Sequence, residues 1–116
     1  MSIVEKIPES VRIIGKTYDI VLSPKAAMPN EYGLCDSERQ RIHVMVDASN
    51  AIIIDTLLHE CLHAIDFSMH LELTERQVHA ASSGLAALFL DNPQLINLFK
   101  EAICGRVGDG RARKGA

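Results

Sequence analysis

The residues with the clearest chemical signature are His59, Glu60 and His63, which form the pattern His-Glu-x-x-His. On an α-helix, side chains four residues apart lie above one another on one face, so both imidazoles can bind a single Zn²⁺. Glu60 lies about 60° around such a helix from His63, where a carboxylate reaches a water on the metal rather than the metal itself. Two imidazoles, an acidified water and a carboxylate base are the parts of a metal-assisted hydrolase.

The residues around this motif are predicted to form the helix that holds it. Asp47 to Asn50 supply candidate N-caps, and the helical pattern runs to about Met69 or His70. His59, His63, Asp66 and His70 share one stripe of this helix. The opposite stripe is expected to face the core, because its members are apolar and helically spaced: Ile54, Leu57, Leu58, Cys61, Leu62, Ile65 and Met69.

A catalytic zinc usually has three protein ligands and one open position, so the chain must supply a third. Thr74 and Gln77 form a capping box, which predicts a second helix beginning there. If the two helices pack antiparallel across the short link, residues 79–83 face the histidines. His79 is therefore the preferred third ligand, and Glu75, one turn earlier, is the alternative. Whichever is not the ligand is expected to support it by a hydrogen bond.

Three further side chains are candidates near the site. Asp66 lies one turn beyond His63, where it either orients an imidazole as a second-shell group or is simply solvated. His43 and Tyr32 could each stabilise an oxyanion, although a strand histidine is more often incidental.

The predicted fold class is α+β. Val11–Ile14 with Thr17–Leu22, and Tyr32–Cys35 with Gln40–Val46, are predicted to be two β-hairpins in a small antiparallel sheet. Ile42, Val44 and Val46 alternate with more polar residues, as in a half-buried strand. The sheet is expected to pack on the motif helix, followed by the second helix and by a C-terminal helix from Pro93 that ends at Gly105.

Length and composition indicate one small globular domain, residues 1–105, with a basic and disordered tail at 106–116. The cysteines, Cys35, Cys61 and Cys104, form no C-x-x-C pair, which argues against a disulfide framework or a zinc ribbon. The net charge of −3 and the absence of Trp do not favour a nucleic-acid partner. The chain has neither an apolar run long enough for a membrane span nor a signal-peptide pattern, so we expect a cytoplasmic protein.

The stretch from Thr56 to Pro93, together with the preceding GLCDSERQRIHV, resembles small phage- and prophage-encoded zinc metallopeptidases of the zincin, gluzincin-like type. This resemblance covers roughly residues 11–99. It implies zinc at His59 and His63, a catalytic Glu60, and location in the bacterial host cytoplasm. The chain lacks both the E-x-x-A-N signature of repressor-cleaving peptidases and the cysteine ribbon that often follows SprT-like domains, so the substrates of those proteins do not carry over.

The leading functional hypothesis is a zinc-dependent peptidase in which Glu60 is the general base. Its peptide or protein substrate is expected to pair as an added strand along the edge formed by Arg41 to Val46. One alternative is a catalytically weak phage protein in which metal stabilises a binding or regulatory module. Another is a hydrolase that acts on a non-peptide amide.

Overall fold

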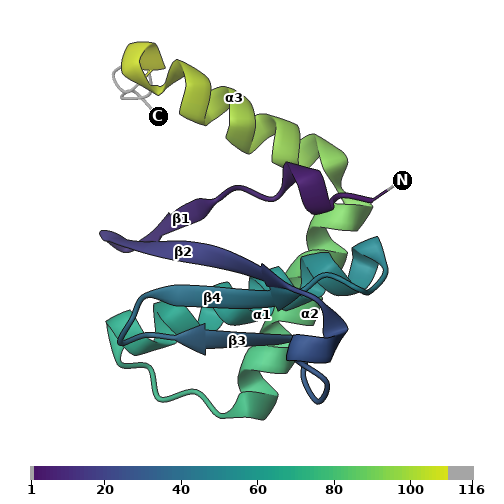
Figure 1. Cartoon of the computed structure of the whole chain (residues 1–116). Coiled ribbons are helices and arrows are strands. Elements are labelled where there is room, and N and C mark those ends of the chain that lie inside the picture. Colours follow the sequence, from purple (N-terminus) through teal and green to yellow (C-terminus); the bar gives the residue numbers. More distant parts are fainter. Residues whose placement is uncertain (1, 110–116) are drawn as a thin grey trace. The chain divides into compact units, whose positions relative to one another are not determined.

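Figure 1 shows the computed structural model, in which residues 2–109 are described, with side chains described for residues 2–105. The chain divides into two compact units, Met1–Ala86 and the part from Ala87 onward. The division does not coincide with the predicted domain end at residue 105. Among the described residues, no helix combines the length and the hydrophobicity needed to cross a membrane.

The first unit contains a four-stranded sheet with the order β1-β2-β4-β3. Its strands are β1 (Ser10–Ile13), β2 (Lys16–Ser23), β3 (Gly33–Asp36) and β4 (Arg41–Met45). The α+β class is therefore as predicted, and both hairpins are antiparallel. The sheet as a whole is mixed rather than antiparallel, because β2 pairs with β4 in parallel. The hairpins meet through their second strands, which leaves β3 at an edge.

Helix α1 (Asn50–Met69) packs against one face of this sheet, behind β4 and β3 in Figure 1. Ser49 caps its first turn by accepting a hydrogen bond from the Ile52 N–H. The core between helix and sheet centres on the side chains of Ile13, Tyr18, Ile42, Val44, Ile53 and Ala64. Ile42 and Val44 are fully buried, which confirms the predicted alternation along β4.

The apolar face predicted for α1 is right only in part: Leu57, Cys61 and Ile65 pack against the core, but the centre of the buried face is rotated from the predicted one. The residues of α1 that are buried against the sheet are Ile53, Thr56, Glu60 and Ala64, whereas Ile54 and Met69 are exposed. Glu60 therefore faces the sheet. His63 and His59 follow at about 60° and 100° around the helix, at the border between sheet and solvent.

Gly33 gives Glu60 the room to face the sheet. A Cβ atom placed on Gly33 would lie 2.6 Å from Cγ2 of Thr56 and 2.9 Å from Oε2 of Glu60. Real side chains do not approach so closely, so β3 can run this near to α1 only with glycine at this position.

Helix α2 (Glu75–Asp91) begins with the predicted capping box. The Thr74 N–H donates to Oε1 of Gln77, and the Gln77 N–H donates to Oγ1 of Thr74. Further along α2, the Ser83 hydroxyl donates to Oδ1 of Asp55, which joins α2 to α1. Two short 3-10 helices, η1 (Val4–Lys6) and η2 (Lys25–Ala27), complete the first unit.

The second unit comprises the end of α2 and α3 (Pro93–Asp109), with Pro93 at the predicted first position. The rings of Phe89 and Phe99 meet edge to face, with 6.4 Å between their centres. Gly105 does not end α3, because one glycine inside a helix costs only about 1 kcal/mol. Residues 106–109 of the predicted tail are therefore helical, and 110–116 lie outside the described residues.

We predict that Gly33→Ala destabilises the protein by about 1–3 kcal/mol, because the new methyl group overpacks the space between β3 and α1. Gly84→Ala is the matched control, since a Cβ at this helical position meets nothing within 4 Å. It should stabilise the protein by up to about 1 kcal/mol. Urea unfolding of both variants measures these changes, and a Gly33→Ala protein as stable as the wild type would contradict the close approach.

Candidate metal centre

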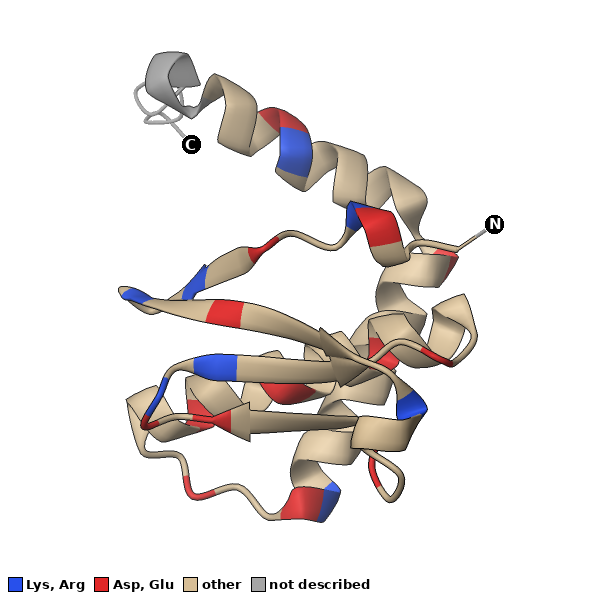
Figure 2. Cartoon of the chain, viewed as in Figure 1, with Lys and Arg blue, Asp and Glu red and all other residues tan. Residues whose placement is uncertain are grey.

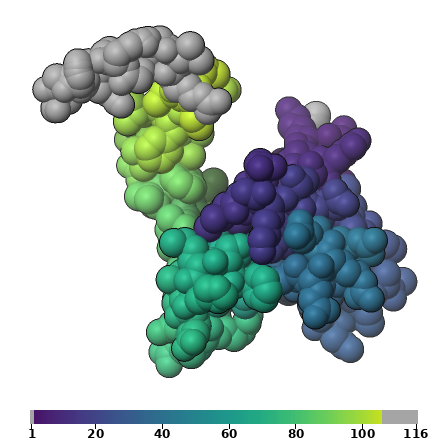
Figure 3. Space-filling view, turned by 90° about the vertical axis from the view of Figure 1, so that its left-hand side faces the viewer, coloured from purple at the N-terminus to yellow at the C-terminus, as the bar shows by residue number. Residues whose placement is uncertain are grey.

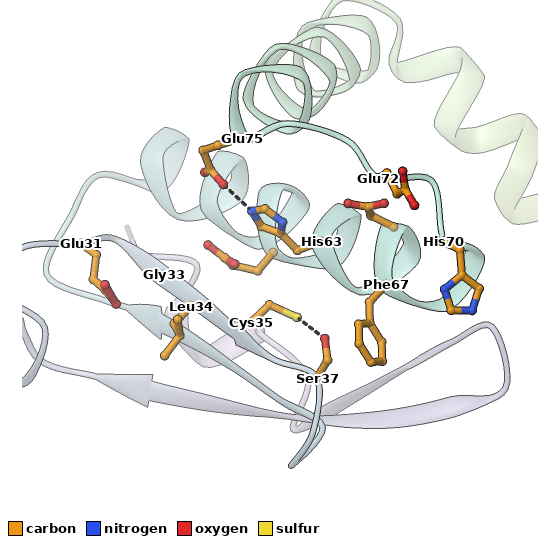
Figure 4. A pocket seen from close by; sticks show the side chains of 12 residues that line it. Glu31, Gly33, Leu34, Cys35, Ser37, His63, Phe67, His70, Glu72 and Glu75 are labelled. Atoms are coloured by element: carbon orange, nitrogen blue, oxygen red, sulfur yellow. Dashed lines mark hydrogen bonds and ion pairs between the residues drawn. The ribbon is translucent and has the colours of Figure 1, made fainter.

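Three side chains converge beside the sheet-facing side of α1: His59, His63 and Glu75. Nε2 of His59 lies 2.7 Å from Oε2 of Glu75, and Nε2 of His63 lies 3.0 Å from Oε1. The two Nε2 atoms are 3.2 Å apart. Figure 4 shows Glu75 reaching down to His63 from the beginning of α2. This group of two imidazoles and one carboxylate could hold a metal ion.

The spacing of these atoms suits a small tetrahedral ion. Ligands about 2.0–2.1 Å from a tetrahedral Zn²⁺ lie about 3.3 Å from one another. The two Nε2 atoms, 3.2 Å apart, match this spacing. They lie 2.7 and 3.0 Å from different oxygens of the Glu75 carboxylate, whose exposed side chain can rotate to place one oxygen on the ion. Imidazole nitrogens with one carboxylate are also a donor set that favours zinc over the harder Mg²⁺ or Ca²⁺.

The structure favours Glu75, the alternative third ligand, over the preferred His79. The ring centre of His79 is 6.0 Å from that of His59, whereas the ring centres of His59 and His63 are 4.8 Å apart. His79 lines a neighbouring cavity of about 230 Å³ with His59 and Glu75 but is not a member of the metal-binding group. The expected hydrogen bond between Glu75 and His79 is not found among the described residues.

The reason is the path of the link between the two helices. The antiparallel prediction assumed that α2 rewinds alongside α1 at about 1.5 Å per residue. Instead, residues 70–74 run back along α1 as an irregular, non-helical segment, as Figure 1 shows, with positive φ at His70 and Glu72. Non-helical chain can cover up to about 3.3 Å per residue, so five residues are more than enough to cross the roughly 10 Å between the levels of His70 and His63 on the helix. The first residue of α2, Glu75, is thus already level with the histidines.

Asp66 holds this link in place. Both of its carboxylate oxygens lie 3.3 Å from the Leu73 N–H, and its backbone carbonyl accepts from the N–H groups of His70 and Leu71. No hydrogen bond from Asp66 to an imidazole is found among the described residues, so its predicted role in orienting one stays a prediction. Its carboxylate binds the backbone that leads to the third ligand, and His70 turns the chain by adopting a left-handed conformation at φ 54°.

Glu60 is the fourth functional side chain, and it is not part of the metal-binding group. It is only 6% exposed, and burial, reinforced by the negative charges of Glu75 and Glu31, raises its pKa to about 7. A carboxylate with a pKa near neutrality, beside but not within a metal-binding group, has the properties of a general base.

The two nearby cysteines are poor candidates for metal ligands. Burial raises the pKa of Cys61 to about 11 and raises that of Cys35 as well, so both thiols stay protonated near neutral pH. Neither cysteine is a member of the metal-binding group, whose donor atoms among the described residues are nitrogen and oxygen.

Of the two predicted oxyanion-stabilising residues, His43 points away from the metal centre and Tyr32 lies near it. His43 alternates with the core residues Ile42 and Val44, so its side chain is on the sheet face that points away from α1. It cannot assist the centre. Tyr32 lines the small cavity together with His59 and Glu75, so its predicted oxyanion role stays a prediction.

Two further residues shape the site, Gly33 and Glu31, and neither was predicted from the sequence. A glycine inside a predicted strand often marks a place where another segment approaches the backbone closely, so the position of Gly33 could have been noticed in the sequence. Glu31 sits in an irregular segment and affects the site only through its charge on Glu60, for which the local sequence holds no pattern.

We predict that Glu75→Ala weakens zinc binding far more than His79→Ala does. Loss of a direct ligand should exceed the roughly 10–100-fold that loss of a supporting group causes, and His79→Ala should fall within or below that range. Zinc titration of both variants against a chromophoric chelator measures the affinities. Tight binding retained in Glu75→Ala but lost in His79→Ala would restore the sequence-based assignment.

We also predict a pH effect on the stability of chelator-treated protein. The folded state binds the Glu60 proton more tightly than the unfolded state, whose pKa is near the ordinary 4.5. The free energy of unfolding contributed by Glu60 is therefore greatest below about 4.5 and is lost as the pH rises to about 7. Denaturation of the wild type and Glu60→Gln across this range isolates the effect, and parallel stability curves would contradict it.

Comparisons of the chain with family models, with curated proteins and with solved structures found no match. The function is therefore argued from the geometry of this centre.

Proposed function

We propose that the protein is a zinc-dependent metallopeptidase that hydrolyses peptide bonds with Glu60 as general base. The observation that carries the proposal is the division of roles at the centre. His59, His63 and Glu75 supply three ligand atoms, and the buried Glu60 is left beside them with a carboxylate free to exchange protons. Zinc held by these three residues would leave one open position, acidify a water there and polarise a substrate carbonyl.

Glu60 performs the proton transfers of this reaction. Its carboxylate accepts a proton from the attacking water as the water oxygen bonds to the peptide carbonyl carbon. The same proton then passes to the amide nitrogen as the carbon–nitrogen bond breaks, which yields a carboxylic acid and an amine. Enclosure by Thr56 and Gly33 keeps the Glu60 side chain in one position between these steps.

The edge strand β3 offers a binding site for an extended peptide. The Tyr32 carbonyl accepts from the Met45 N–H, so the alternation of an antiparallel ladder directs the N–H and C=O groups of Gly33 and Cys35 away from β4. A substrate strand could pair with these groups and pass directly beside Glu60. The prediction that a substrate pairs along Arg41–Val46 is wrong, because β4 lies between β2 and β3 and is not an edge strand.

A second candidate function is a metal-stabilised binding or regulatory module without useful turnover. The observation that favours it is the exposure of Glu75, whose side chain is 71% exposed. A metal held by Glu75 and two residues of α1 would fasten the start of α2 to α1, and this fastening is useful with or without catalysis.

Glu60→Gln separates the two functions. We expect wild-type protein to bind about one Zn²⁺ per chain and to cleave members of a mixed peptide library. Glu60→Gln should bind zinc equally well and lose activity by at least about 100-fold, the usual contribution of general-base catalysis. Elemental analysis and mass spectrometry of the digest provide the readouts. If zinc raises the melting temperature of the wild-type protein but the zinc-loaded protein cuts no peptide, the metal-stabilised binding or regulatory module is favoured.

A further inference from the structure

The cleft beside the metal centre has an unusual distribution of charge. It measures about 710 Å³ and runs between β3 on one side and α1 with the link on the other. In Figure 3 the surface is hollowed between the blue atoms of the β3–β4 region and the teal and green atoms of α1 and the link. Within the part of the chain that the structure describes, no lysine or arginine lines it, but five carboxylates do: Glu31, Glu60, Asp66, Glu72 and Glu75.

Three of these carboxylates already have a role. Glu60 and Glu75 belong to the proposed centre, and Asp66 binds the Leu73 N–H. Glu31 and Glu72 make no hydrogen bond or ion pair among the described residues. Figure 4 shows them at opposite ends of the cleft, with His63 between them, and Figure 2 shows the acidic residue on the link. Each end of the cleft therefore presents an unpaired negative charge to anything bound along β3.

Glu60 adds a second, independent indication of a ligand. The residue is only 6% exposed, lines the cleft, and has no hydrogen-bond partner among the described residues. A molecule bound in the cleft can therefore donate a hydrogen bond to this carboxylate.

The wall near Glu72 suits a long side chain that ends in a positive charge. Phe67 lines this part of the cleft and is half exposed. Its ring already attracts an ammonium group, because Nζ of Lys16 lies 5.6 Å from the ring centre. The aliphatic stem of a lysine or arginine can pack on such a ring while the charged end reaches a carboxylate. The other nearby cation, Arg39, is paired with Asp36.

We propose that this cleft selects peptides that carry a lysine or arginine close to the bond that is cut. The inference rests on the proposed peptidase function and names its substrate class. The peptide pairs with β3, its carbonyl faces the metal centre, and its basic side chain lies against Phe67 towards Glu72 or, at the other end, beside Glu31. The summed negative charge of the cleft also draws basic peptides in from solution.

The test uses the zinc-loaded full chain and two peptide libraries that differ only in having lysine or glutamine at one position. Cleavage rates at low substrate concentration give kcat/KM for each peptide, and fluorescence anisotropy of labelled peptides on Glu60→Gln gives binding without turnover. We expect lysine peptides to be preferred in both readouts. The preference should fall as salt is raised from about 0.01 to 0.15 M, because the charges are partly exposed.

Glu31→Gln and Glu72→Gln should each lower the lysine-to-glutamine ratio by roughly 1.5- to 5-fold, the worth of one exposed ion pair. Glu9→Gln is the matched control, because Glu9 is exposed beside β1 at the opposite edge of the sheet and should leave the ratio unchanged. Zinc stoichiometry and melting temperature verify that each variant is folded.

The outcomes separate this inference from the function on which it rests. Cleavage with a ratio near one, or with a ratio that the double variant Glu31→Gln/Glu72→Gln does not change, would overturn the substrate class and leave the peptidase standing. Lysine-selective binding without any cleavage would support a cleft that selects cationic side chains and would reject the peptidase. Binding of additional Zn²⁺ that Glu31→Gln or Glu72→Gln abolishes would also overturn the proposal, because the two carboxylates would then be metal ligands.

Discussion

The arrangement of the metal centre depends on the hydrogen bonds that Asp66 makes to the link between α1 and α2. Its carbonyl ends the helix by accepting from His70 and Leu71, and its carboxylate binds the Leu73 N–H. Together these bonds hold a non-helical segment against the helix that precedes it. Without them the chain could leave α1 in many directions, and Glu75 would reach the histidines in few of them.

The second constraint is the contact between β3 and α1. A glycine lets the edge strand approach until the Glu60 carboxylate is enclosed, and this enclosure raises its pKa. The ligands and the base therefore have different structural origins. The ligands are positioned by one helix and the turn that follows it, whereas the base acquires its properties from the sheet.

Features with local signals could be predicted from the sequence. The end of α1, the Thr74–Gln77 capping box, the start of α3 at Pro93 and the buried residues Ile42 and Val44 each follow from a few adjacent residues. The rotation of α1 could not be predicted, because three consecutive isoleucines, Ile52, Ile53 and Ile54, make it ambiguous which helix face is apolar. The path of the link between α1 and α2 could not be predicted for another reason. His70 and Glu72 have positive φ. Few residues other than glycine adopt this backbone conformation, and the residue types at these two positions do not predict it. The order of the strands depends on a parallel pairing between distant segments, which no local pattern specifies.

The short distance along the chain between the ligands bears on how the molecule assembles. His59, His63 and Glu75 lie within 17 consecutive residues, and only 12 positions separate His63 from Glu75. Closing so short a loop costs little chain entropy, so an ion can be captured once α1 and its turn have formed. Gly33, by contrast, is 27 positions from Glu60 and must be brought in by sheet formation. If the proposed function holds, a nascent chain would complete the metal-binding group before Glu60 is enclosed, and hydrolytic competence would come only with the last non-local contacts of folding.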